Sequence, residues 1–203
     1  LKRPFEQQWA YNNGHSSIEG DIDKAAKFLE SSSRPFMKTV AVESNHDKWL
    51  DRWLDDGRGL KERHNLTAFF RYGLARAEAN DNDDTEFSTW RFALRNTSYN
   101  LENIEFIPEG HGFEICREYG GIQIGQHGHL GPKGGPSTPS AHSKVSEQMT
   151  IGDKHSPEIK DGLYVAGVSC ILNLRFNKGA SSWRHAHVVH YPNGRRTILF
   201  VQD

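Results

Sequence analysis

The stretch that most constrains the fold is residues 39–47, where four residues with strand chemistry lead directly into polar ones. Residues 39–42 form the short apolar run that is typical of a buried strand in an α/β sheet. Asn45, His46 and Asp47 follow at the carboxyl end of that strand. Open α/β sheets bind their ligands at this edge, so we expect a functional loop here. A turn that caps the next helix is the alternative interpretation of a single tripeptide.

The three residue types suit metal-assisted chemistry. Asn45 offers a neutral carbonyl oxygen to a hard cation, and an imidazole such as that of His46 donates or accepts a proton near neutral pH. Asp47 is placed to fix the tautomer of the ring beside it.

Length and charge narrow the function classes. A chain of 203 residues predicts one domain over 1–203, and its net charge of −1 gives no overall electrostatic attraction to nucleic acid. A polyanionic substrate must therefore be held locally or through a metal. Residues 111–203 contain 8 of the 11 histidines, so we expect most of the chemistry there.

Cysteine usage and hydropathy predict a cytoplasmic protein without a membrane partner. The two cysteines, Cys116 and Cys170, have neither metal-site nor disulfide-framework spacing, which favours a reducing compartment. No apolar run approaches membrane-spanning length, and the first residues have no signal-peptide core.

The pattern of elements predicts an α/β fold. Apolar residues at helical spacing predict helices over 21–29 and 48–54, and the charged stretch at about 57–100 predicts a helical excursion. From residue 103 onward, short apolar runs between glycines predict strands. The runs are 104–108, 112–116, 122–125, 149–152 and 163–168, followed by a hairpin around Asn193-Gly194.

Three of the predicted strands end in potential metal ligands, at residues 45–47, 127–129 and 153–155. Each group alone is explained by a polar turn, and we interpret His64, His185, His187 and His190 in that way. Three such strand ends in one α/β chain indicate a site. We therefore expect Asn45, His127, Asp153 and His155 to converge at one edge of the sheet.

The order and spacing of these groups resemble the calcineurin-like metallophosphoesterase family, over roughly residues 20–203. That family has an Asn-His-Asp/Glu after a strand, then a His-Gly pair, and then a Gly-His-x-His to which residues 152–155 are similar. The Gly/Pro loop after His127, residues 177–183 and the closing hairpin look most like phage-encoded members, DNase-type proteins among them.

The resemblance implies a β-sandwich flanked by helices, in αββα layers, and a hydrolase with a two-metal centre. It implies that Asn45, His127 and Asp153 hold one divalent ion and that His155 helps to hold the second. It assigns His46 to the scissile phosphate and the leaving oxygen, with Asp47 orienting its ring. Nitrogen and oxygen ligands favour Mn²⁺, with Zn²⁺, Fe²⁺ or Mg²⁺ as alternatives.

The chain departs from that pattern at two points. Asp153 stands where the family has a histidine, which predicts an altered metal preference. The family's first two metal motifs have no counterpart before Asn45, and the pair Asp21 and Asp23 has the wrong spacing. We therefore expect the C-terminal portion of such a domain, with its N-terminal strands missing or supplied by a partner chain or by a homo-oligomer. On this interpretation residues 1–203 alone bind at most one Mn²⁺, weakly, and do not hydrolyse phosphodiesters.

The predicted function is a metal-dependent phosphodiesterase, a nuclease acting on DNA, in the host cytoplasm if the chain is phage-encoded. A phosphomonoesterase or nucleotide phosphatase of the same fold is one alternative. A non-catalytic structural or regulatory relative is the other.

Overall fold

The computed structural model describes residues 17–145, 147–172 and 180–201. Residues 177–179 of the stretch that carries the phage-like resemblance lie outside the described residues. The chain divides into two compact units, Leu1–Pro108 and Glu109–Asp203, and each is described by itself below. The expected single domain over 1–203 stays a prediction.

Unit 1 is mainly helical. Its helices are α2 (Ile18–Ser32), α3 (Trp49–Asp55), α4 (Leu66–Asp81) and α5 (Thr89–Arg95), with short 3₁₀ turns η1 (Arg58–Lys61) and η2 (Arg63–Asn65). Helix α2 begins earlier than the sequence predicts, because the Ser17 side chain caps it by accepting a hydrogen bond from the Gly20 backbone. Asp21 therefore lies inside the first turn of the helix, where its carboxylate pairs with Lys24.

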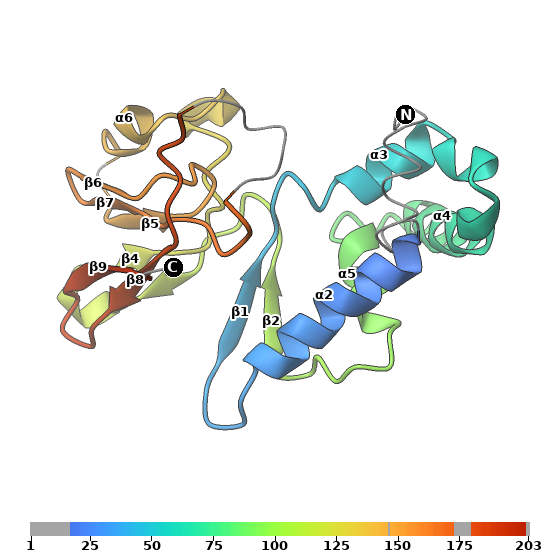
Figure 1. Cartoon of the computed structure of the whole chain (residues 1–203), viewed down its shortest axis with the longest axis horizontal. Helices are drawn as coiled ribbons and strands as arrows, with labels where there is room; N and C mark the ends of the chain where they lie inside the picture. Colours follow the sequence, from blue (N-terminus) through green and yellow to red (C-terminus); the bar gives the residue numbers. More distant parts are fainter. Residues whose placement is uncertain (1–16, 146, 173–179, 202–203) are drawn as a thin grey trace. The chain divides into compact units, whose positions relative to one another are not determined.

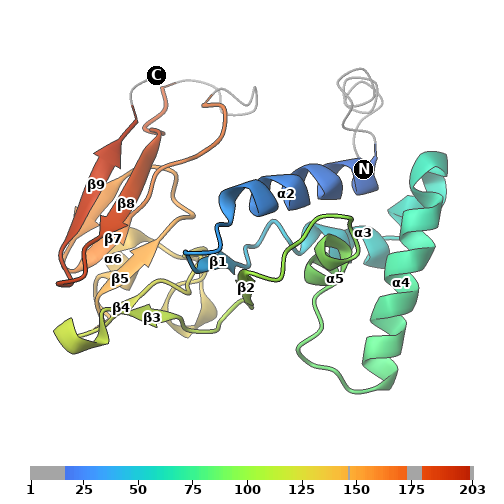
Figure 2. The same cartoon turned by 90° about the horizontal axis from the view of Figure 1, so that it is seen from below.

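Strands β1 (Thr39–Val42) and β2 (Ile104–Ile107) of unit 1 pair in parallel, with Thr39 opposite Ile104. Strand β1 has the predicted bounds, but all four residues are half-buried rather than buried. The apolar core lies between the strands and the helices and includes Ala26, Trp53 and Leu94. Figure 1 and Figure 2 show α2 and α5 next to this strand pair and α4 farther from it.

Unit 2 contains a five-stranded sheet in the order β3-β4-β5-β7-β6. The strands are β3 (Glu114–Ile115), β4 (Ile122–Gln123), β5 (Met149–Ile151), β6 (Glu158–Lys160) and β7 (Leu163–Val165). Strands β4, β5 and β7 run in parallel, and the two outer strands run antiparallel to their neighbours. Met149, Ile151, Leu163 and Val165 form the core cluster of this sheet.

The closing hairpin is present as predicted. Strands β8 (Ala186–His190) and β9 (Arg196–Phe200) pair antiparallel, and Gly194 takes a positive φ of 76° in the turn that the Asn-Gly pair predicts. Between the strands of unit 2 lie the 3₁₀ turns η3 (Arg117–Tyr119) and η4 (Pro132–Gly134) and the short helix α6 (Pro139–His142). The chain is therefore mixed α/β, with helices and several sheets.

Candidate metal site

His127 and Asp153 come together in unit 2 because they follow neighbouring parallel strands. His127 lies beyond β4, and Asp153 follows β5 after one glycine. The His127 carbonyl oxygen accepts hydrogen bonds from the backbone N–H groups of Gly152 and Asp153, each at 3.0 Å. These bonds fix the two loops against each other and leave His127 Nε2 3.3 Å from Asp153 Oδ1.

Gly128 lets the backbone turn directly over strand β5. Its φ is 103°, and a Cβ at this position would lie 2.8 Å from the Cβ of Ile151. Both facts require glycine. The Gly128 carbonyl oxygen lies 3.4 Å from Nε2 of the buried His142, which packs against the same loop. His142 therefore supports the histidine loop from within.

The Asp153 carboxylate is also bound by its neighbour Lys154. Lys154 Nζ donates to Oδ2 at 2.7 Å, and both side chains are about four-fifths buried. Burial alone would raise the pKa of Asp153, but the hydrogen bond and charge of Lys154 and the charges of His127 and His129 outweigh it and hold that pKa below its usual range. Asp153 is thus an ionised carboxylate that already has three cationic or potentially cationic neighbours, Lys154, His127 and His129.

Two more residues belong to this cluster: His129, which lies in the predicted group at 127–129 but was assigned no role, and Glu109, which was not predicted. His129 Nε2 lies 2.6 Å from Glu109 Oε1, and the rings of His127 and His129 are 5.4 Å apart. Glu109 directly follows Ile107 and Pro108 at the end of β2, which is the same strand-end signal that identified the other groups. His142 has no such local signal.

His155 lies in a turn with a positive φ of 62°, and its ring packs edge-on against Trp183 with 4.3 Å between the ring centres. In the described part of the chain, no three His, Cys, Asp or Glu side chains are grouped in a way that would hold a metal ion. The predicted second ion, held in part by His155, stays a prediction.

The loop after β1 in unit 1 is held by Asp47. Its carboxylate accepts a hydrogen bond of 2.7 Å from the Ser44 backbone N–H, and the Asp47 N–H donates to the Ser44 carbonyl at 3.1 Å. Burial raises the pKa of Asp47, although the hydrogen bonds from Ser44 oppose the shift. Asp47 therefore fixes the loop backbone through Ser44, and its predicted role in orienting the His46 ring stays a prediction.

This loop presents the other predicted residues in different ways. The His46 side chain is exposed and its ring lies 4.9 Å from that of Trp49. Asn45 is half-buried, and its side-chain oxygen is buried without a hydrogen-bond partner among the described residues. A buried carbonyl oxygen with no partner costs free energy, and a bound cation would satisfy it.

Asn45 and the pair formed by His127 and Asp153 follow strands of different sheets. The expectation of one shared sheet edge is therefore correct for His127 and Asp153 and wrong for Asn45, because β1 pairs only with β2 in the described residues. The pair in unit 2 offers an imidazole nitrogen and a carboxylate oxygen, and Asn45 in unit 1 offers an amide oxygen. These donors suit Mn²⁺, so the residues fit the implied metal in chemical type.

The chain is similar to Protein A1 of Escherichia phage T5, with 35% identity over 191 residues. The match covers 93% of this chain and 34% of the phage protein, so the chain spans about a third of the length of that relative. No family model matches the sequence, and no solved structure matches it. None of the described helices is both long enough and apolar enough to span a membrane.

Proposed function

We propose that this chain forms part of a metal-dependent phosphoesterase, most simply a phosphodiesterase that cleaves DNA. The observation that carries the proposal is the 3.3 Å approach of His127 Nε2 to Asp153 Oδ1, at the ends of neighbouring parallel strands. The αββα sandwich of the calcineurin-like enzymes is the fold that we propose for the whole domain. The similarity to a phage protein supports a phage origin and a place of action in the host cytoplasm.

His127 and Asp153 would hold a divalent ion, with Mn²⁺ the preferred metal. Asn45 supplies a further oxygen of the right chemical kind, which is buried and without a hydrogen-bond partner in the described residues. A divalent ion, when bound, lowers the pKa of a coordinated water and draws charge from a phosphate oxygen. In the same proposal, His155 would help to hold a second ion.

The remaining residues have roles of their own. The exposed His46 ring is available to donate a proton to the leaving oxygen, and the contact with Trp49 limits its rotation. Asp47 holds the loop that carries it. Gly128 and His142 keep the His127 backbone against β5.

Calorimetric titration with Mn²⁺ tests the metal-binding part without requiring activity. Asp153→Asn and His127→Gln should each weaken binding at least tenfold, because each removes one of the few protein ligands. Glu158→Gln is the matched control, since Glu158 is exposed on β6 and carries the same charge. Binding that is equally strong in all four proteins would refute the site. Asn45→Ala, measured in the same way, decides whether the Asn45 oxygen contributes.

The substrate class is tested separately in a protein that contains the complete site. Linear DNA, a chromogenic phosphodiester and a chromogenic phosphomonoester are compared with Mn²⁺ present. The proposal predicts cleavage of DNA and of the diester. Preference for the monoester would favour the phosphatase alternative, and Mn²⁺ binding without any hydrolysis would favour a non-catalytic relative.

A further inference from the structure

The β8–β9 hairpin of unit 2 has an unusual charge pattern. Residues 180–201 contain three arginines, three histidines and no Asp or Glu. The structure describes all of them. Arg195, Arg196, His187 and His190 lie in the hairpin itself, residues 186–200. In a chain with 26 acidic residues and a net charge of −1, this hairpin therefore carries positive charge and no carboxylate side chain of its own.

Arg196 anchors this charge within unit 2 through neutral partners. Its guanidinium donates to the carbonyl oxygens of Met149 at 2.7 Å and Gly162 at 2.8 Å and to Gln148 Oε1 at 3.0 Å. It also lies over the Tyr164 ring at 4.2 Å. Burial lowers the pKa of Arg196, and the contacts found for it in the described residues include no carboxylate. The half-buried charge is thus satisfied by hydrogen bonds and stays available as positive potential.

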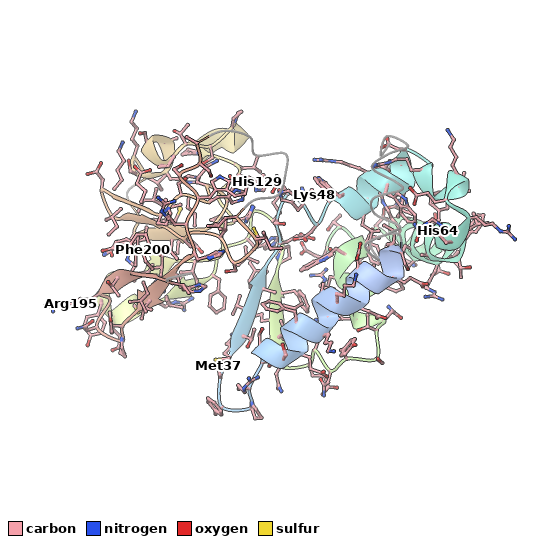
Figure 3. All side chains as sticks on the ribbon, in the orientation of Figure 1. Met37, Lys48, His64, His129, Arg195 and Phe200 are labelled. Carbon is pink, nitrogen blue, oxygen red and sulfur yellow. The ribbon has the colours of Figure 1, made fainter. Side chains whose placement is uncertain are left out.

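Beside Arg196 lies an open pocket of about 510 Å³, lined by Tyr191, Pro192, Asn193, Arg195 and Arg196. Tyr191 is 45% exposed, and Arg195 is exposed at the turn. Figure 3 shows Arg195 at the tip of the hairpin, directed away from the strands. The Arg195 backbone N–H is held by Asn193 Oδ1 at 3.1 Å, so the turn that presents it is fixed.

We propose that this pocket binds single-stranded nucleic acid, with Arg195 on a backbone phosphate and the Tyr191 ring stacked on a base. This inference rests on the proposed function, since it names the surface that would hold the phosphodiester strand. A positive groove combined with an exposed aromatic ring is the combination that single-stranded binders use. An acidic protein segment would need the arginines but not the flat ring beside them.

The test is fluorescence anisotropy of the 203-residue chain with a labelled single-stranded oligothymidylate, in EDTA so that no metal site takes part. Tyr191→Ala should weaken binding by roughly 5- to 100-fold, the range expected for the loss of one stacked base. Tyr191→Phe keeps the ring and should bind like the wild type. Arg195→Gln should make the negative slope of log K against log salt shallower by about 0.7, which is the contribution of one phosphate contact on a single strand.

Lys27→Gln is the matched charge control, because Lys27 is exposed on α2 of unit 1. Failure of the wild type to bind the oligonucleotide would overturn the proposal. Binding by the Tyr191→Ala and Arg195→Gln variants that is as strong as that of the wild type would also overturn it. Displacement of the oligonucleotide by poly-glutamate as readily as by unlabelled oligonucleotide would also overturn it, since it would indicate a general anion surface. These outcomes leave the Mn²⁺ titration unaffected, so failure of the pocket and failure of the metal site are distinguishable.

Discussion

Replacing Lys154 with methionine should strengthen Mn²⁺ binding, because Lys154 and a metal ion compete for the same carboxylate. Lys154 Nζ donates to Asp153 Oδ2 at 2.7 Å. A divalent ion on Asp153 would have to displace this bond or bind close to the lysine charge. Methionine keeps the length of the lysine stem as far as Cε, with a thioether sulfur in place of Cδ, and removes the ammonium group.

The magnitude follows from the contact. A hydrogen bond to a charged group contributes about 1.5 to 3 kcal/mol to stability. We use the lower end of this range because both side chains keep some contact with water, with 24% of Lys154 and 17% of Asp153 exposed. Loss of about 1.5 kcal/mol of competition corresponds to roughly tenfold tighter binding. Calorimetric titration of the wild type, Lys154→Met and the control Lys144→Met measures it, because Lys144 is exposed in the same unit. Unchanged or weaker Mn²⁺ binding by Lys154→Met, with the control equal to the wild type, would show that Lys154 does not compete with the ion for Asp153.

Three other predictions test the loops and the catalytic assignment. Gly128→Ala should lower the free energy of unfolding by about 1 to 3 kcal/mol in urea titrations, because the new Cβ meets Ile151 and φ is positive. Gly135→Ala is the control and should change the free energy of unfolding little, because a Cβ there meets nothing within 4 Å. Equal losses in the two variants would contradict this prediction. Burial lowers the pKa of His142 below 6.5, so the unfolded chain binds its proton more readily and stability should fall as the pH drops through about 6.5. His142→Gln should flatten that part of the curve of unfolding free energy against pH, and an unchanged curve would contradict the assignment. In a protein with the complete site, His46→Ala should reduce the rate of DNA cleavage by about 10²- to 10⁴-fold with the Mn²⁺ content retained. His64→Ala is the control and should leave the rate unchanged, because His64 is another exposed histidine of unit 1. Loss of metal from His46→Ala would identify His46 as a ligand instead.

Elements with strong local chemistry were predictable from the sequence. Strand β1 has the bounds that its run of β-branched and small residues predicts, and the Asn193-Gly194 turn joins β8 to β9 as expected. Strand β6 and helix α6 were not predicted. Residues 158–160 carry two charges in three positions, and their strand exists because they pair with β7.

The candidate site was predictable only where strand ends defined it. His127 and Asp153 meet because β4 and β5 are neighbouring parallel strands, which end at the same edge of the sheet. The ends of these strands can be recognised from the local sequence alone. The pairing of β1 with β2 in a separate sheet depends on packing over the intervening helices, which no local pattern records. The contacts of His142 and Glu109 are likewise tertiary, and of these two only Glu109 had a strand-end signal, whereas Lys154 contacts its sequence neighbour Asp153.

The most direct test of the central claim is a Mn²⁺ titration of residues 1–203 by calorimetry, with the Asp153→Asn variant beside the wild type. We expect one Mn²⁺ per chain, bound weakly by the wild type and lost from the variant. No detectable binding by the wild type would contradict the claim that His127 and Asp153 hold a divalent ion, and so would undiminished binding by Asp153→Asn.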